Sequence, residues 1–370
     1  MTESFKLPLL QQHEEALEKC VYCPKLCRAS CAVSVVSGSE SLTPWGKMSL
    51  AYFQARGDVE LSEDIAASAW ACSSCLACKE RCEHDHSVAE VLGDVRTELR
   101  SRGASPPQIQ RVVDEAKHRS LEMRRAAEAI MTNGQNSRSE GVPLLVGCSY
   151  MRHAPAEAED ICQVAERLIG PIQLQSSCCG LPLLDAGEPE LFVDHLKKLS
   201  ASMAGKDRVV VADPGCARAL LDLGPRLEPD LEIPEVILLV DAVYANLDRI
   251  PAAVFKGRAV GYQDPCQLGR GLGRYEEPRA ILARICGQPP KEMVRNRQHA
   301  ECSGGGGLLP LTYPDISSKM AAEQIAEQEQ HGGELVTACA SSLRRYRRSG
   351  AGAVELMSLV AEAMRRTDEG

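Results

Sequence analysis

Apolar positions in the first third of the chain recur at helical intervals. The segments with this pattern are 44–57, 62–71, 87–103 and, in a longer and more polar form, roughly 107–132. The polar segment NGQNSRSEG, residues 133–141, is typical of a loop. The pattern predicts a helical first domain over residues 1–132 and a linker over 133–141.

Short β-rich runs alternate with helical segments in the rest of the chain. The runs are VPLLVG (142–147), RVVVAD (208–213), RAVGYQ (258–263) and ELVTA (334–338). Helical patterns at 156–170, 189–203 and 317–330 follow or separate them. This alternation predicts parallel sheets with crossover connections. We therefore expect a multidomain α + α/β protein.

The second half of the chain contains an internal duplication, which its cysteines mark. In order, the two sets are Cys148, Cys178, Cys179 and Cys216, and then Cys266, Cys302 and Cys339. Flanking segments match as well, because VPLLVGCSY corresponds to GRAVGYQDPC and DRVVVADPGCARAL to GGELVTACASSL. An internal repeat explains this agreement best. It predicts one α/β repeat over 142–254 and a second over 255–370.

Composition narrows the class of protein. The chain has 370 residues, a formal net charge of −9 and 17 cysteines. The acidic balance argues against a general nucleic-acid binder. We read no signal peptide and no transmembrane stretch, which predicts a cytoplasmic protein associated with membranes only through partners. In a reducing cytoplasm, clustered cysteines indicate metal or redox chemistry rather than a disulfide framework.

Eight cysteines in the first domain form two closely spaced runs. The first run is Cys20, Cys23, Cys27 and Cys31, and the second is Cys72, Cys75, Cys78 and Cys82. The second has the C-x2-C-x2-C-x3-C spacing of bacterial ferredoxins, in which three thiolates hold one 4Fe-4S cluster and the fourth reaches the neighbouring cluster. By this crossover, one cluster takes Cys20, Cys23, Cys27 and Cys82, and the other takes Cys72, Cys75, Cys78 and Cys31. The alternative is two zinc sites with four thiolates each.

The cysteines of the duplicated half follow the expected strands at or near their carboxyl ends. Folds of this kind bind ligands at that edge of the sheet. Helices that start there also favour thiolate over thiol. The adjacent pair Cys178–Cys179 is poorly suited to a core, since neighbouring side chains of a strand point to opposite faces. The pattern therefore predicts a second type of metal centre, gathered from three loops.

The duplicated pattern resembles the cysteine-rich CCG domain of heterodisulfide reductases. The segments DPCQLGRGLGRYEEPRAIL, ECSGGGG and LVTACASSL carry the resemblance. The same domain occurs in the iron–sulfur subunits of glycolate oxidase and anaerobic glycerol-3-phosphate dehydrogenase. A helical two-cluster ferredoxin-like domain followed by two CCG domains is similar to the iron–sulfur subunit of heterodisulfide reductase that carries both parts in one chain. The resemblance covers nearly the whole chain.

The resemblance also implies ligand positions for the two repeats. In repeat one, Cys148, Cys178, Cys179 and Cys216 fall on four of the family's five ligand positions. In repeat two, Cys266, Cys302 and Cys339 fall on three of five. The remaining positions are occupied by Ala219, Ser303 and Ser342. Repeat one is thus expected to hold a further iron–sulfur cluster or a zinc ion, and repeat two a depleted cluster or nothing.

The function implied is that of an iron–sulfur electron-transfer subunit in a larger cytoplasmic oxidoreductase complex. It would relay electrons between another subunit, expected to be a flavoprotein, and a centre in the CCG domain. The alternative is a catalytic heterodisulfide or thiol reductase acting at a noncubane cluster. A zinc-stabilised scaffold is the third hypothesis. Cys162 and Cys286 lie outside all these motifs and are expected to be buried apolar residues, while His84 and His86 are expected at the solvated surface.

Overall fold

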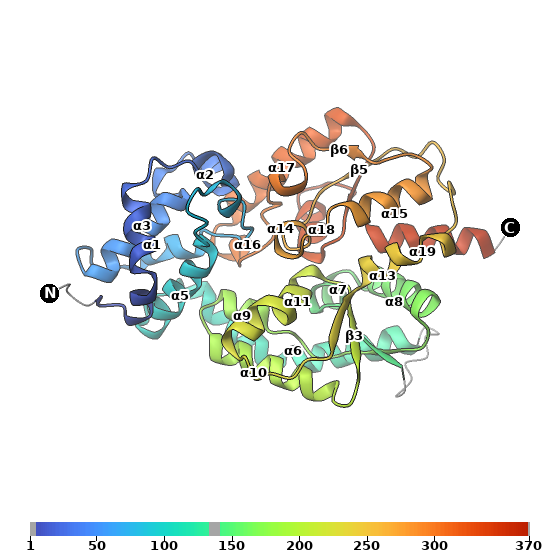
Figure 1. Ribbon diagram of the computed structural model, residues 1–370, viewed down its shortest axis with the longest axis horizontal. Coiled ribbons are helices and arrows are strands. Elements are labelled where there is room, and N and C mark those ends of the chain that lie inside the picture. Colours follow the sequence, from blue (N-terminus) through green and yellow to red (C-terminus); the bar gives the residue numbers. More distant parts are fainter. Residues whose placement is uncertain (1–4, 133–140, 369–370) are drawn as a thin grey trace.

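The computed structural model describes residues 5–132 and 141–368, so that most of the expected linker 133–141 lies outside the described residues (Figure 1). Helices and short 3₁₀ turns build the first part, and residues 5–132 contain no strand. The helices are α1 (Glu14–Tyr22), α2 (Ala32–Ser37), α3 (Pro44–Arg56), α4 (Glu63–Ala67), α5 (Val88–Ser101) and α6 (Pro107–Thr132). The expectation of a helical first region is confirmed.

Helix α3 shows why these segments are helical. Thr43 caps its amino end, since the Thr43 side chain accepts a hydrogen bond from the Gly46 amide, and Pro44 occupies the first turn. Gly57 ends the helix in the left-handed conformation, with φ of 78°. Met48 and Ala55 on this helix are fully buried. Helix α6 instead leaves this region and packs against α7, α8 and α9 of the first α/β repeat.

Two four-stranded parallel sheets form the second half, and their strand orders are equivalent. The first sheet has the order β2-β1-β3-β4 and the second β6-β5-β7-β8. Their strands are β1 (Val142–Leu145), β2 (Ile172–Leu174), β3 (Arg208–Val211), β4 (Glu235–Leu238), β5 (Val260–Tyr262), β6 (Lys291–Glu292), β7 (Glu334–Thr337) and β8 (Val354–Glu355). In the central pairs Leu144 aligns with Val210 and Gly261 with Leu335. The equivalent orders agree with an internal duplication.

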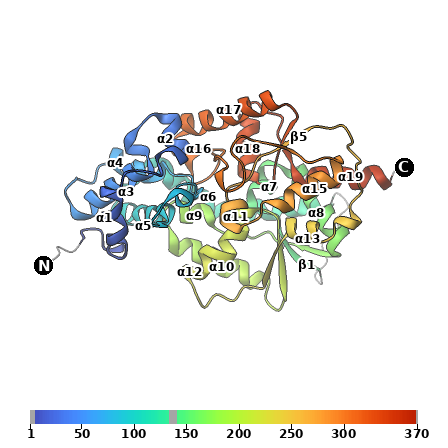
Figure 2. The same cartoon turned by 45° about the horizontal axis from the view of Figure 1, so that its top comes forward.

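Helices cover both sheets, and the two repeats lie side by side (Figures 1 and 2). Those of the first repeat are α7 (Cys148–His153), α8 (Pro155–Ile169), α9 (Leu181–Asp185), α10 (Pro189–Ser202), α11 (Pro214–Arg218), α12 (Gly224–Leu227) and α13 (Leu239–Ala245). Those of the second are α14 (Gly269–Leu272), α15 (Glu276–Cys286), α16 (Leu309–Thr312), α17 (Pro314–His331), α18 (Ala340–Arg348) and α19 (Leu356–Asp368). Helix α19 packs on α8 across the repeats, and Arg365 donates to Asp160 at 2.7 Å.

One apolar core runs through the helical region and both repeats. Its fully buried members include Trp70 in the first region, Leu144 in the first sheet, and Tyr262 in the second. No helix among the described residues is long and apolar enough to cross a membrane.

Candidate metal centres

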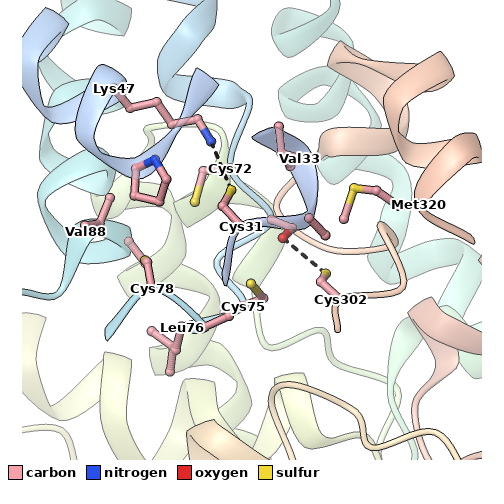
Figure 3. Close-up of a pocket in the computed structure, with 15 residues that line it drawn as sticks. Cys31, Val33, Lys47, Cys72, Cys75, Leu76, Cys78, Val88, Cys302 and Met320 are labelled. Atoms are coloured by element: carbon pink, nitrogen blue, oxygen red, sulfur yellow. Dashed lines mark hydrogen bonds between the residues drawn. The ribbon is translucent and has the colours of Figure 1, made fainter. Parts of the chain in front are cut away.

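Two cavities in the helical region bring the eight cysteines of the two runs together. The first cavity is lined by Cys20, Cys23, Cys27 and Cys82. The second cavity is lined by Cys31, Cys72, Cys75 and Cys78 (Figure 3). These two sets are the same as those given by the crossover arrangement. In each set, three cysteines come from one run and the fourth comes from the other run. Cys78 lines both cavities, so the two are adjacent. That these thiols ligate clusters stays a prediction.

The loops that carry these cysteines adopt an unusual backbone conformation. Lys25, Ser74, Leu76 and Asp85 all have positive φ, between 53° and 68°, although none is glycine. One result is that backbone amides point at sulfur. The Ser74 N–H donates to Cys72 Sγ at 3.4 Å. Such N–H···S bonds stabilise anionic sulfur and tune iron–sulfur centres.

Burial raises the pKa of several thiols that line the two cavities. Burial, followed by neighbouring thiols, raises the pKa of Cys20 to about 12. Burial also raises the pKa of Cys27, to about 11, and that of Cys78 well above its ordinary value. A bound metal centre must therefore displace these protons, which couples binding to pH.

Lys47 is a buried cation at the second cavity that the sequence analysis did not single out. It lies on α3, is only 2% exposed, and places Nζ 4.0 Å from Cys31 Sγ (Figure 3). A lone buried ammonium is costly unless an anion compensates it. A lysine on the buried face of an apolar helix is the signal that could have identified it.

Repeat one brings its four predicted cysteines into one group. Cys148 begins α7, Cys178 and Cys179 lie between β2 and α9, and Cys216 lies in α11. Cys179 Sγ is 3.3 Å from Cys216 Sγ. The thiols of Cys148 and Cys179 hydrogen-bond to Cys178 and hold its pKa well below the ordinary value. Three loops at the carboxyl edge of one sheet thus supply four sulfurs.

The position after the cysteine pair requires glycine for a steric reason. Gly180 has φ of 80°, and a Cβ there would stand 2.8 Å from the Cβ of His195. Its N–H donates to Cys178 Sγ at 3.5 Å. Any other residue would move the loop that presents Cys178 and Cys179.

Arg119 of α6 is a second site residue that the sequence analysis missed. It is 4% exposed and hydrogen-bonds to Cys178, with Cys148 also close enough to interact electrostatically. Its Nε and Nη1 find no hydrogen-bond partner among the described residues. A buried guanidinium with free donors beside four sulfurs fits an anionic thiolate centre. Its sequence signal is faint, because α6 carries many exposed charges.

Repeat two is arranged differently. The side chains of Ser303 and Ser342, which stand where the family has cysteines, hydrogen-bond to each other at 2.9 Å. The Ser342 side chain also hydrogen-bonds with Cys339. Cys302 lines the second cavity and contacts the thiols of Cys266 and Cys75. The Cys266 contact, and then burial, raise the pKa of Cys302 to about 12.

Two cysteines and two histidines considered in the sequence analysis remain outside these thiol groups. Cys162 in α8 and Cys286 in α15 are buried, as expected. His84 is exposed, also as expected. His86 is not a freely solvated residue: it is half-buried, lines the first cavity, and donates its backbone N–H to Cys82 Sγ at 3.4 Å. The turn at Asp85, with φ of 53°, brings it back toward the sulfur.

The donor sets fit iron–sulfur chemistry. Among the described residues, no three His, Cys, Asp or Glu side chains are already arranged to hold a single metal ion. The thiols of the helical region surround cavities instead, with amides and a buried cation directed at sulfur. Soft thiolate ligands select iron–sulfur clusters or zinc.

Comparison with protein families assigns both halves. A model described as a 4Fe-4S dicluster domain matches residues 16–86, which contain both cysteine runs. A model described as a cysteine-rich domain, CCG, matches residues 142–220 and again 260–342. The chain therefore contains a 4Fe-4S dicluster domain and two cysteine-rich CCG domains. The resemblance inferred from the duplicated motif is confirmed.

Several relatives of this CCG-domain protein are subunits of oxidoreductases. One subunit of the dihydromethanophenazine:CoB–CoM heterodisulfide reductase from Methanosarcina mazei is 24% identical over 327 residues, covering 82% of this chain and 79% of the relative. One subunit of the fumarate reductase (CoM/CoB) from Methanothermobacter marburgensis is 25% identical, covering 85% and 64%. A probable glycolate oxidase iron-sulfur subunit from Bacillus subtilis is 24% identical, covering 85% of each chain. An electron-transfer role fits all three.

Proposed function

We propose that this CCG-domain protein is the iron–sulfur relay subunit of a cytoplasmic oxidoreductase complex. It takes electrons from, or gives them to, a flavoprotein partner and passes them between two 4Fe-4S clusters and a centre in repeat one. The observation that carries the proposal is the adjacency of the two four-cysteine cavities. Cys78 lies between the two cavities, and Cys302 of repeat two lines the second. Electron transfer weakens steeply with distance, so adjacency of the sites favours a relay.

In this proposal each group of thiols has its own centre. The first cluster is held by Cys20, Cys23, Cys27 and Cys82, and the second by Cys72, Cys75, Cys78 and Cys31. Repeat one, with Cys148, Cys178, Cys179 and Cys216, holds a further iron–sulfur cluster or a zinc ion. Repeat two, with Cys266, Cys302 and Cys339, has an incomplete set, in agreement with the paired Ser303 and Ser342 hydroxyls.

Freeze-quench EPR on the full chain with the Cys266→Ser exchange, which removes the partly exposed thiol of repeat two that would react with an added disulfide, tests the function. The protein is purified without oxygen and reduced with dithionite. For a relay, the reduced cubane signals persist when a small disulfide is added and disappear when a one-electron acceptor is added. A disulfide reductase would instead oxidise its clusters with the disulfide and release thiol. Release of thiol in proportion to the clusters oxidised would replace the relay by the catalytic function.

Exchange of Lys47 for methionine tests the charge at the second cavity. Reduction adds one negative charge to a cluster, and the buried ammonium stabilises that charge. Lys47→Met is expected to lower the midpoint potential of one cluster by on the order of 50 mV and to leave the other nearly unchanged. An EPR-monitored redox titration measures both. Lys197→Met, at an exposed lysine of α10, is the control, and equal potentials in the two variants would refute the role of Lys47.

Exchange of Arg119 for leucine tests the centre of repeat one. Without the guanidinium, four clustered thiolates repel one another and retain metal less well. Arg119→Leu is expected to release the repeat-one metal to a chelator several-fold faster than the parent protein, with Arg119→Lys between them. Arg111→Leu, at an exposed position of the same helix, is the matched control. Identical release from the two leucine variants would show that Arg119 has only a packing role.

A further inference from the structure

The cysteines of repeat two fall into two groups, because Cys339 contacts Ser342 while Cys266 contacts Cys302. Ser303 and Ser342 are both buried, and their mutual 2.9 Å hydrogen bond satisfies the hydroxyls. Ser342 also holds the Cys339 thiol. Cys266 and Cys302 contact each other instead.

The Cys302 thiol lies against the second cavity. It is 3% exposed, contacts the thiol of Cys75, and donates to Ser73 Oγ at 3.2 Å (Figure 3). The Gly304 N–H donates to its sulfur at 3.4 Å, and Gln324 holds its carbonyl at 2.7 Å. The thiol is therefore fixed in direct contact with a predicted cluster ligand.

The glycines that follow Cys302 keep this loop on the helical region. A Cβ on Gly307 would stand 2.2 Å from the Cys72 carbonyl oxygen, and one on Gly306 would stand 2.8 Å from that of Ser73. Side chains at these positions would separate the loop from the cysteine run. The ECSGGGG segment thus places a repeat-two loop directly on the second cavity.

Arg270 fixes the Cys266 loop to the same place. It donates to the Cys75 carbonyl at 2.7 Å and to the Ala300 carbonyl at 2.7 Å. The neighbouring Gln267 donates to the Ser74 carbonyl at 3.0 Å. One guanidinium therefore joins the loops of Cys75, Cys266 and Cys302. Cys266 is half-buried, which leaves it a route to solvent.

We propose that Cys266 and Cys302 form a redox-active thiol pair that exchanges electrons with the centre at the second cavity. On oxidation the two S–H bonds break and one S–S bond forms. Two protons leave to solvent past Cys266, and two electrons leave one at a time through the second cavity to the flavin of the proposed flavoprotein partner, which is the oxidant. Reduction reverses each step. The inference rests on the proposed relay and adds a two-electron store to it.

Thiol labelling on the full anaerobic chain tests the pair. The protein is equilibrated in dithiothreitol buffers of graded potential and quenched in acid. Free thiols are then alkylated with light iodoacetamide, and thiols released by a later reduction are alkylated with heavy iodoacetamide. We expect the free thiols of Cys266 and Cys302 to disappear together as the potential rises, and a disulfide-linked peptide to appear. The fraction oxidised should depend on potential as expected for a two-electron couple. Cys266→Ser and Cys302→Ser should each abolish the linked peptide. Cys286→Ser, at a buried cysteine of the same repeat, should leave it unchanged.

Iron content separates this inference from the proposed function. Both serine variants should keep about eight irons per chain and the reduced cubane EPR signals. If iron stays near eight while Cys266 and Cys302 remain two free thiols at every potential, the thiol pair is wrong and the relay stands. If Cys302→Ser loses iron, Cys302 is a cluster ligand and the thiol pair is also wrong. If the parent protein binds no iron, the relay itself fails.

Discussion

Exchange of Cys31 for serine is expected to remove the same four irons as exchange of Cys72. Both residues line the second cavity, although they come from different runs. Each single variant should lose about half of the cubane iron, and the double variant Cys31→Ser/Cys72→Ser should lose no more than either alone. Iron and sulfide analysis, with EPR of the dithionite-reduced proteins, measures the loss.

The double variant Cys72→Ser/Cys82→Ser is the matched comparison. Cys82 belongs to the same run as Cys72 but lines the first cavity. This variant should lose about eight irons, since it removes one ligand from each cluster. If each run instead held its own cluster, Cys31→Ser/Cys72→Ser would lose about eight irons and Cys72→Ser/Cys82→Ser only about four. That exchange would overturn the crossover assignment.

The second large effect concerns the buried Glu355 of β8 and the pH dependence of stability. Glu355 is 2% exposed, and its carboxyl accepts hydrogen bonds from Tyr150 at 3.2 Å and from the Ser358 amide at 3.0 Å. Burial raises its pKa from 4.5 to about 8. The folded protein therefore binds a proton more tightly than the unfolded chain does. Its contribution to stability is complete below about pH 4.5 and is lost as the pH rises to about 8.

Glu355→Gln should remove most of this pH dependence. The full shift corresponds to on the order of 5 kcal/mol in the free energy of unfolding between the two pH limits. Glutamine keeps an acceptor for Tyr150 and carries no charge at any pH. Thermal unfolding of the variant and of the parent protein is monitored by circular dichroism at about pH 5 and at about pH 8.5. These two pH values span most of the range over which Glu355 changes the stability. Glu190→Gln, at an exposed carboxyl of α10, is the control, and an unchanged pH dependence in Glu355→Gln would contradict this account.

Sequence periodicity predicted the longer elements well. The segments 87–103 and 189–203 correspond to α5 and α10, because an amphipathic helix carries its apolar face in its own sequence. The segment 44–57 corresponds to α3, which is buried on most of its surface. The four predicted strands are β1, β3, β5 and β7, which are the inner strands of the two sheets. The edge strands were missed. For example, β6 is only Lys291–Glu292, and its pairing with β5 defines it rather than any apolar pattern.

Site residues were predictable from the sequence where they belong to a motif of characteristic spacing. Those that reach the site only through the packing of distant segments were not predictable. The cysteine runs have characteristic spacing, and the structure brings together the four-cysteine sets that the spacing implies. Lys47 and Arg119 come from helices distant in sequence from the sulfurs they face. The substitutions at Ser303 and Ser342 were visible, but their mutual hydrogen bond depends on the folded loops.

The most direct test of the central claim is the metal and sulfide content of the full chain purified without oxygen, with EPR of oxidised and reduced samples. The account predicts about eight irons and eight sulfides from two interacting cubane clusters, together with either one zinc or further iron in repeat one. A colourless protein that contains zinc and no sulfide would contradict the account.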